Sequence, residues 1–211
     1  MHILLTDILT CPRCGPEFGL VVMADHWDDR LVQAGRLGCA NCRESYAIEA
    51  GVVDLRHSTV SPLPSGESVG SDPERAFRAA ALLGVNDVNA TLLVVEPAGE
   101  AAGEVARVLQ GTHVVGGSAE PNPGFQGGES VLSSILIGEQ IPLRDRSVRG
   151  IALLGTVSTK LIEEAARLLV RGARLVVDPA PPELSKELRE QGFTVHLEQD
   201  GVVVATASAH P

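Results

Sequence analysis

The sequence predicts an α/β protein in two parts. A small β module comes first, and a mostly parallel sheet follows, covered on both faces by helices and closed by an antiparallel terminal strand. Three observations support this fold class. Two Cys-x-x-C pairs stand near the N-terminus, a Ser/Pro/Gly-rich stretch follows, and apolar strands then alternate with amphipathic helices. We therefore divide the chain into a module at residues 1–57, a linker at 58–71 and a domain at 72–211.

The N-terminal module is expected to consist of short strands. Alternating apolar residues bounded by Asp, Gly and Asn predict strands at 20–23, 30–37 and 45–48. A domain of this size cannot fold on apolar burial alone, so a disulfide cross-link or a bound metal ion would supply much of its stability.

The four cysteines are the candidates for this cross-link or metal site. They form two pairs, Cys11 with Cys14 and Cys39 with Cys42. This spacing is typical of a structural zinc site, in which four thiolates surround the ion tetrahedrally and leave no position for water or substrate. The alternatives are two disulfides or a redox-active pair. The lack of a signal-peptide pattern, and of a strand-to-helix setting for either pair, favours zinc.

The C-terminal domain should begin with a helix. Asp72 is a capping acid, Pro73 suits the first helical position, and Gly84 ends the segment. Beyond it, the hydrophobic pattern predicts strands at 91–96, 112–116, 131–138, 148–155 and 173–178, with helices over 100–110, 158–170 (ending at Gly172) and 182–191 (ending at Gly192). Asp200-Gly201 joins the last two strands, 193–198 and 201–208, and predicts a hairpin, so the sheet should finish with an antiparallel strand.

Composition narrows the classes of partner. The net charge is −10 and aromatic residues make up 3% of the chain. Such a chain repels a phosphate backbone and offers few stacking platforms, so we expect no DNA binding and disfavour RNA binding. No apolar stretch is long enough to span a bilayer. We expect a soluble, cytoplasmic protein without membrane contact.

Two resemblances add to these inferences. The order of elements from Asp72 to the C-terminus, with segments 141–158 and 170–181, resembles the Rossmann-like domain of S-adenosylmethionine-dependent methyltransferases. The segments LLTDILTCPRCG (4–15) and CANCRESYAIEAGVVDL (39–55) resemble the small zinc-ribbon activator subunits that bind and stabilise methyltransferases, with Ala47 where that family usually has proline. The chain is thus expected to join a zinc ribbon to a Rossmann-like methyltransferase sheet.

The methyltransferase resemblance implies a cofactor-binding loop, and the sequence of this chain matches the family's pattern for that loop poorly. The family's first loop reads acid-x-Gly-x-Gly-x-Gly, and counted from Glu96 its glycine positions hold Ala98, Glu100 and Ala102. Glycines replace the acid expected after the second strand. The candidate cofactor residues are therefore Glu96, Gly99, Gly116 and Gly117. S-adenosylmethionine is a possible cofactor but a disfavoured one, and Glu96 could instead cap the next helix.

Other polar residues are weaker candidates, and no catalytic residue is assigned. His113 and His196 lie in strand patterns and are more often core or edge histidines than catalytic bases. Asp178 ends a strand, where ligand sites of α/β proteins lie, but it could simply cap a turn. The helix segment with Glu163 and Glu164 is expected to face solvent.

The leading hypothesis is a zinc-binding, non-catalytic methyltransferase-like protein that acts as a protein-binding, activator or scaffold module. Its partner would be a protein, such as a methyltransferase or a second copy of the chain. The first alternative is an active methyltransferase whose ribbon recognises an rRNA or protein acceptor. The second is a site for another nucleotide or metabolite lined by Gly99, Gly116 and Gly117.

Overall fold

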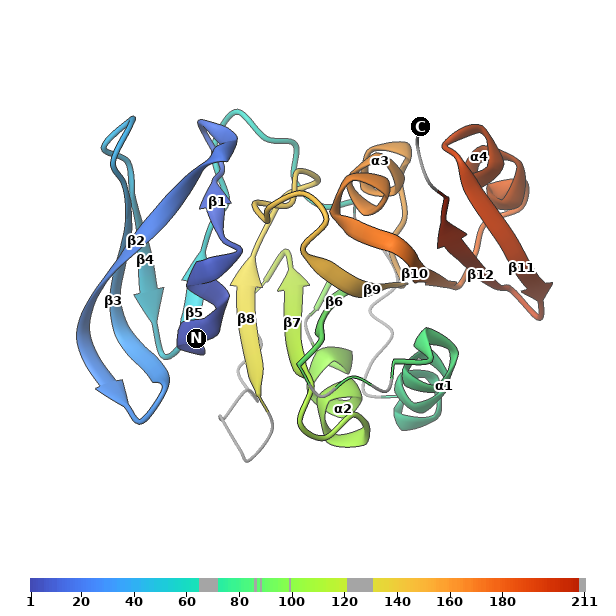
Figure 1. Cartoon of the computed structure of the whole chain (residues 1–211), viewed down its shortest axis with the longest axis horizontal. Coiled ribbons are helices and arrows are strands. Elements are labelled where there is room, and N and C mark those ends of the chain that lie inside the picture. The colour runs from blue at the N-terminus through green and yellow to red at the C-terminus, as the bar shows by residue number, and fades with distance from the viewer. Residues whose placement is uncertain (65–71, 86, 88, 99, 121–130, 209–211) are drawn as a thin grey trace.

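The structure is a computed structural model that describes residues 1–64, 72–85, 87, 89–98, 100–120 and 131–208. The strands form one 12-stranded sheet in the order β1-β2-β3-β4-β5-β8-β7-β6-β9-β10-β12-β11. Figure 1 shows the strands of the N-terminal zinc-ribbon-like module (residues 1–57, here called the ribbon) at one end of this sheet and the terminal hairpin of β11 and β12 at the other. The Pro- and Gly-rich segment PNPGFQGG at 121–128 lies outside the described residues.

The N-terminal module is almost entirely β structure. It contains the 3₁₀ turn η1 (Ile3–Asp7) and the strands β1 (Thr10–Cys11), β2 (Gly15–Asp28), β3 (Leu31–Cys39), β4 (Ser45–Glu49) and β5 (Val52–Asp54). Each strand pairs antiparallel with the next along the chain. The three predicted strands are present, β2 is longer than expected, and β5 has no counterpart in the sequence-based prediction.

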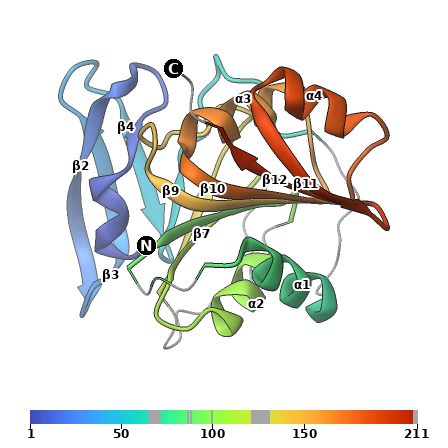
Figure 2. The same ribbon diagram turned by 45° about the vertical axis from the view of Figure 1, so that its right-hand side comes forward.

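The C-terminal domain has the predicted α/β order. Its elements are α1 (Pro73–Leu83), β6 (Thr91–Val95), α2 (Ala101–Val108), β7 (His113–Ser118), β8 (Leu132–Leu136), β9 (Val148–Leu154), α3 (Thr159–Leu168), β10 (Leu169–Asp178), α4 (Leu184–Glu190), β11 (Phe193–Gln199) and β12 (Val202–Ala207). Strands β8, β7, β6, β9 and β10 are parallel, and β12 is antiparallel to both β10 and β11. Helices α1 and α2 cover one face while α3 and α4 cover the other (Figures 1 and 2). The predicted fold class is confirmed.

Helix α1 begins and ends where its sequence signals predict. The Asp72 side chain accepts hydrogen bonds from the backbone N–H groups of Glu74 and Arg75, and Pro73 occupies the first turn. Gly84 ends the helix in the left-handed conformation at φ 61°. A residue with a Cβ is strained in that conformation, which explains glycine at this position.

Helix α3 ends earlier than predicted. The expected end was Gly172, but the helix stops at Leu168 and Leu169 already has extended backbone angles. Tertiary contacts cause the difference, because Leu169 is buried and pairs with Val148 of β9. Gly172, at φ 75°, lies instead in an irregular stretch of β10. The helical hydrophobic pattern extends beyond Leu168 in the sequence, but the pairing of Leu169 with β9 outweighs this local preference for helix.

The two parts of the chain share one sheet and one core. Strand β5 pairs parallel with β8, with Val53 opposite Ile135. Apolar side chains of the ribbon, such as Leu37 and Ile48, belong to the same buried cluster as Val115 and the α3 face of the sheet. A second cluster fills the space beneath α1 and α2. The division of the chain at residues 57 and 71 stays a prediction.

The described helices are short, and none combines the length and the apolar character that a membrane-spanning helix requires.

Candidate metal centre and cofactor crevice

The four cysteines converge at one end of the ribbon. All four sulfur atoms lie within 4.8 Å of one another, and all four thiols are free. The Sγ atoms of Cys11 and Cys42 are 3.6 Å apart, and those of Cys14 and Cys39 are 3.8 Å apart. Zn–S bonds of about 2.3 Å in a tetrahedron place sulfurs about 3.8 Å apart, whereas a disulfide needs about 2 Å. The donor set therefore fits a four-coordinate zinc ion.

The surroundings of the cluster also suit thiolate ligands. Asn41 donates its side-chain N–H to the Sγ of Cys14 at 3.4 Å, and the Tyr46 hydroxyl lies 3.4 Å from the Sγ of Cys11. The second turn closes through a backbone hydrogen bond from Arg43 to Cys39 of 3.0 Å. Such contacts orient sulfur ligands around a metal. Tyr46 is one of the residues that carried the resemblance to ribbon activators.

The protonation of the cluster is uneven. Burial alone would raise the pKa of the Cys39 thiol, but backbone hydrogen bonds from Cys42 and Asn41 outweigh it and lower that pKa to about 7. Burial and the neighbouring thiols raise the pKa of Cys42 to about 12. Cys39 therefore loses its proton more readily than Cys42, and a bound cation would favour the deprotonated form of both.

The first cysteine pair is anchored to the C-terminal domain. Thr10 donates its backbone N–H to the carbonyl of Pro142 at 2.9 Å, and Arg144 donates to the carbonyl of Ile8 at 2.8 Å. Pro142 and Arg144 belong to the loop between β8 and β9. The metal centre is therefore coupled to the larger sheet through this loop as well as through β5.

The same loop is held by an ion pair on α3 in which Glu164 is buried and Arg167 is half-buried. Arg167 donates to the carbonyls of Ile141 and Leu143 and pairs with Glu164 at 2.6 Å. Glu164 also accepts the backbone N–H of Ile141 and is 5% exposed. The expectation that Glu164 faces solvent is therefore wrong. Sequence reasoning missed the pair because an amphipathic pattern does not show that a loop folds over the helix.

The strand order of the larger sheet reverses between the carboxyl ends of β6 and β9, and α/β proteins commonly bind ligands at such a point. This point is here called the crevice. Glu96 follows β6 and is 4% exposed. Its carboxylate accepts a hydrogen bond from the backbone N–H of Ala102 in α2 at 3.0 Å. Burial raises the pKa of Glu96, although hydrogen bonds from Ala101, Ala102 and Glu100 oppose the shift. The side chain is thus oriented as a helix cap.

The candidate glycines next to Glu96 lie within β7. A Cβ on Gly116 would lie 2.8 Å from the Cβ of Ala102, and one on Gly117 would lie 2.6 Å from Ile137. Close packing on both faces of β7 therefore explains glycine at these positions. Whether a cofactor also contacts them stays a prediction. Gly99 lies outside the described residues.

The chain that leaves the ribbon passes along this carboxyl edge. Ser61 accepts the backbone N–H of Glu139 at 2.9 Å, and Pro62 forms a β-bridge with Gly138 just beyond β8. Pro64 then accepts the hydroxyl of Thr156, which follows β9, at 3.2 Å. Residues 56–64, here called the strap, therefore reach from β5 to the point where the strand order reverses.

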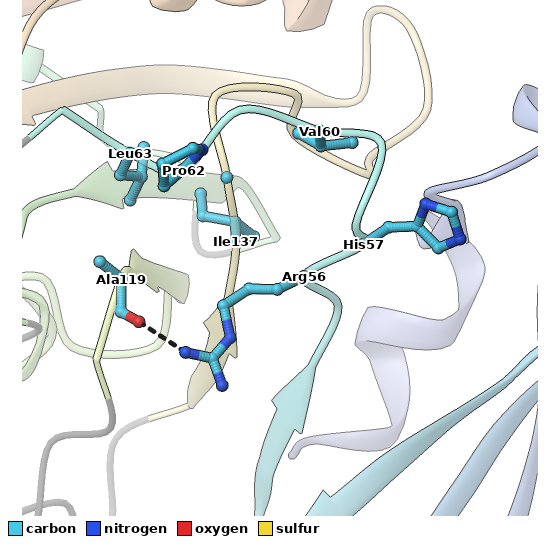
Figure 3. Close-up of a pocket in the computed structure, with 8 residues that line it drawn as sticks. Arg56, His57, Val60, Pro62, Leu63, Ala119 and Ile137 are labelled. Carbon is cyan, nitrogen blue, oxygen red and sulfur yellow. Dashed lines mark hydrogen bonds between the residues drawn. The ribbon is translucent and has the colours of Figure 1, made fainter.

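A pocket of about 180 Å³ lies beneath the strap. Figure 3 shows it between the strap and the ends of β7 and β8, with Leu63, Ala119 and Ile137 on its walls. Arg56 lies at its rim, where it donates to the carbonyl of Ala119 at 3.1 Å and pairs with Asp54. The guanidinium is thus fully engaged in joining the end of β5 to the loop after β7.

Asp178 ends β10 and is committed to ion pairs. Arg78 of α1 donates to its carboxylate through two nitrogens, one of them 3.1 Å away, and Arg75 lies 3.7 Å from its other oxygen. These contacts tie α1 to the carboxyl edge of the sheet. Asp178 is therefore an anchor for the helix, a role closer to the capping alternative than to that of a ligand.

The two strand histidines lie in different environments. His113 is buried, its Nε2 is 3.0 Å from the Ser133 hydroxyl, and its ring centre is 5.6 Å from that of His2. Burial lowers the pKa of His113 to about 4, and the neighbouring His2 and N-terminal charges act in the same direction. His196 is exposed on β11 and bonds to Thr206 at 2.8 Å. His113 begins β7 and His196 lies within β11, so neither follows the carboxyl end of a strand as Glu96 and Thr156 do.

Comparison with solved structures agrees with this topology. A chain from the complex between the Haloferax volcanii Trm112 methyltransferase activator and a methyltransferase superposes with a TM-score of 0.52 at 16% identity, over 64% of this chain and 89% of that one. Geranyl diphosphate C-methyltransferase from Streptomyces coelicolor A3(2), in complex with Mg²⁺, geranyl diphosphate and S-adenosyl-L-homocysteine, gives 0.54 at 12% identity over 70% and 90%. A geranyl diphosphate methyltransferase in complex with SAM gives 0.54 at 11% identity over 72% and 99%.

The fold is that of S-adenosylmethionine-dependent methyltransferases. No protein-family model and no curated protein sequence matches the chain. The methyltransferase sheet explains why Glu96, Thr156 and Asp178 all lie at one edge: each follows the carboxyl end of a parallel strand. Sequence reasoning placed Glu96 and Asp178 at strand ends but missed the strap, because its contacts join residues far apart in the chain.

Proposed function

We propose that this chain is a zinc-stabilised, non-catalytic member of the methyltransferase fold that works as a protein-binding or scaffold module. The ribbon acts as a built-in stabiliser, because β5 extends the methyltransferase sheet beyond β8 and the first cysteine pair holds the loop after β8. A sheet edge that would otherwise be free is thereby covered within the same chain. Its protein partner would be a methyltransferase or a second copy of the chain.

The orientation of Glu96 is the observation that supports a non-catalytic role. In this structure its carboxylate bonds to α2 rather than facing the crevice. The loop that follows has Ala98, Glu100 and Ala102 where the family's glycines let the cofactor approach the backbone. The strap contacts Thr156 at the same edge. These features together disfavour S-adenosylmethionine binding.

The alternative is an active methyltransferase, favoured by the retained strand order around the crevice. A protein acceptor suits the net charge of −10 better than rRNA does. Under this alternative the Glu96 side chain would turn from α2 toward the cofactor.

Calorimetric titration of S-adenosylmethionine and S-adenosylhomocysteine into zinc-loaded protein separates the two roles. We expect no heat of binding at ligand concentrations up to about 1 mM. Micromolar binding that Glu96→Gln weakens, and that the exposed control Glu190→Gln on α4 leaves unchanged, would favour the active alternative. Binding of neither ligand would leave the scaffold role in place.

The metal is tested separately. Elemental analysis should find one zinc ion per chain, and substitution with Co²⁺ should give the absorption of a tetrahedral tetrathiolate site. Cys42→Ser should lose the metal and lower the unfolding temperature, whereas Ser45→Ala, an exposed change three residues away in β4, should do neither. A fully folded protein without metal at neutral pH would contradict a stabilising zinc site.

A further inference from the structure

The outermost long strand of the sheet carries an apolar surface that nothing in the described chain covers. Val21 is 60% exposed, Met23 46% and Trp27 64%, all on β2. Leu20 and Val22, which alternate with Val21 and Met23, pack against the ribbon core, and two register shifts separate Trp27 from this regular stretch. Large apolar side chains gathered on one exposed strand mark an interaction surface more often than isolated ones do.

The same strand has a free hydrogen-bonding edge. On one side β2 pairs with β3, in regular register from Leu20 to Ala24. On the other side β1 pairs only with Gly15 and Gly19. Within the described residues, no strand pairs with this side of β2 beyond Gly19, at the far end of the sheet in Figure 1. An extended segment of another chain can add there by backbone hydrogen bonding.

Charge selects among possible occupants. Asp25, Asp28 and Asp29 follow the regular part of the edge, and β-bulges interrupt pairing around His26. Acids and bulges are also how proteins protect an edge from self-pairing, and they disfavour a second copy of a chain whose net charge is −10. These three acids outnumber the exposed Arg30 and Arg36, the second of which lies opposite Met23, and they attract a strand that carries cations.

We propose that the free edge of β2 binds an extended segment of a partner protein in which lysine or arginine alternates with apolar residues. The segment pairs with the backbone of Leu20–Ala24, its apolar side chains pack on Val21 and Met23, and its cations lie near the aspartates at the end of the strand. This inference rests on the proposed protein-binding role and names the partner's chemistry.

Trp27 is the single tryptophan of the chain and lies on the same strand a few residues beyond Ala24, so its fluorescence reports on this end of β2. Titration with a short peptide alternating lysine and valine should shift Trp27 emission to shorter wavelength and saturate, with binding that weakens at about 0.5 M salt. A glutamate–valine peptide should not bind. A lysine–valine peptide with a central proline should bind much more weakly, because proline removes a ladder donor.

Two exposed substitutions test the location. Met23→Lys should raise the Kd for the lysine–valine peptide about tenfold or more. Phe77→Lys, which alters an even more exposed apolar residue on α1, should not change it. Equal binding by the Met23→Lys protein or by the proline peptide would overturn the proposal. So would a wild-type dimer that Met23→Lys converts to a monomer, since the occupant would then be a second copy. None of these readouts depends on S-adenosylmethionine, so this inference and the cofactor titration can fail independently.

Discussion

The carboxylate of Glu96 accepts a hydrogen bond from the backbone N–H of Ala102, six residues later, at 3.0 Å. This bond places a buried acid at the N-terminus of α2, where the helix dipole favours negative charge. Glu100, the residue just before the helix, makes no side-chain capping bond. Glu96 therefore supplies from the strand end the cap that the helix lacks locally.

Replacement of Glu96 should alter stability in a pH-dependent way. Burial raises its pKa in the folded protein, so the protonated form is favoured by folding. The contribution of Glu96 to stability is fully present below its pKa in the unfolded chain. It is lost as the pH rises through its higher pKa in the folded protein. Glu96→Gln, which keeps an acceptor, should remove this loss, and Glu96→Ala should cost about 1 kcal/mol through the missing cap.

Urea unfolding of the three proteins at several pH values measures this effect. Glu190→Gln, an exposed change on α4, is the control and should leave the pH slope unchanged. A wild-type slope identical to that of Glu96→Gln would show that Glu96 titrates normally.

His113 should make the protein less stable in acid. Its folded pKa of about 4 lies below the ordinary value of about 6.5, so the unfolded chain binds the proton more tightly. Stability is fully present above pH 6.5 and falls as pH decreases toward 4, by about 3 kcal/mol in total. His113→Gln should flatten this part of the pH profile.

The matched control is His196→Gln, which removes an exposed histidine bonded to Thr206. Both variants retain the four cysteines, so acid loss of a metal would affect them equally. If the two variants and the wild type share one pH profile, the buried pair of His113 and His2 does not govern acid stability.

Deletion of residues 1–57 should make the remainder aggregate. The deletion removes β5, so β8 becomes a free edge, and it uncovers the apolar cluster around Ile135 and Ile137. Exposed edges of this kind associate with other chains. Light scattering should show large species, and a monomeric, folded remainder would contradict an intramolecular stabilising role for the ribbon.

The ion pair between Arg167 and Glu164 should contribute more to the free energy of unfolding than the exposed ion pair on the same helix. Arg167→Ala leaves the Glu164 carboxylate buried without its cation and should cost about 3 kcal/mol. Lys160→Ala breaks an exposed pair with Glu163 and should cost less than about 1 kcal/mol. Thermal unfolding of the two variants compares them, and equal effects would show that the loop at Ile141 does not depend on Arg167.

Part of the structure could be predicted because its signals are local. Cysteine spacing predicted the cluster of Cys11, Cys14, Cys39 and Cys42, and its four sulfurs do lie together. Asp72, Pro73 and Gly84 set the ends of α1 through their own backbone preferences. The turn at Gly201 predicted the terminal hairpin, and the order of strands and helices predicted the methyltransferase sheet.

The remaining features depended on contacts between distant residues. Pairing of Leu169 with Val148 ended α3 before Gly172, and a folded loop buried Glu164. The pairing of β5 with β8 joined two segments that the sequence separates by about eighty positions, and such long-range pairing leaves no local signal. By itself the sequence determined which elements form and which residues could hold a metal. Only the tertiary structure decided that Glu96 caps α2 and that ribbon and sheet share one core, because burial and hydrogen-bond partners are set by packing.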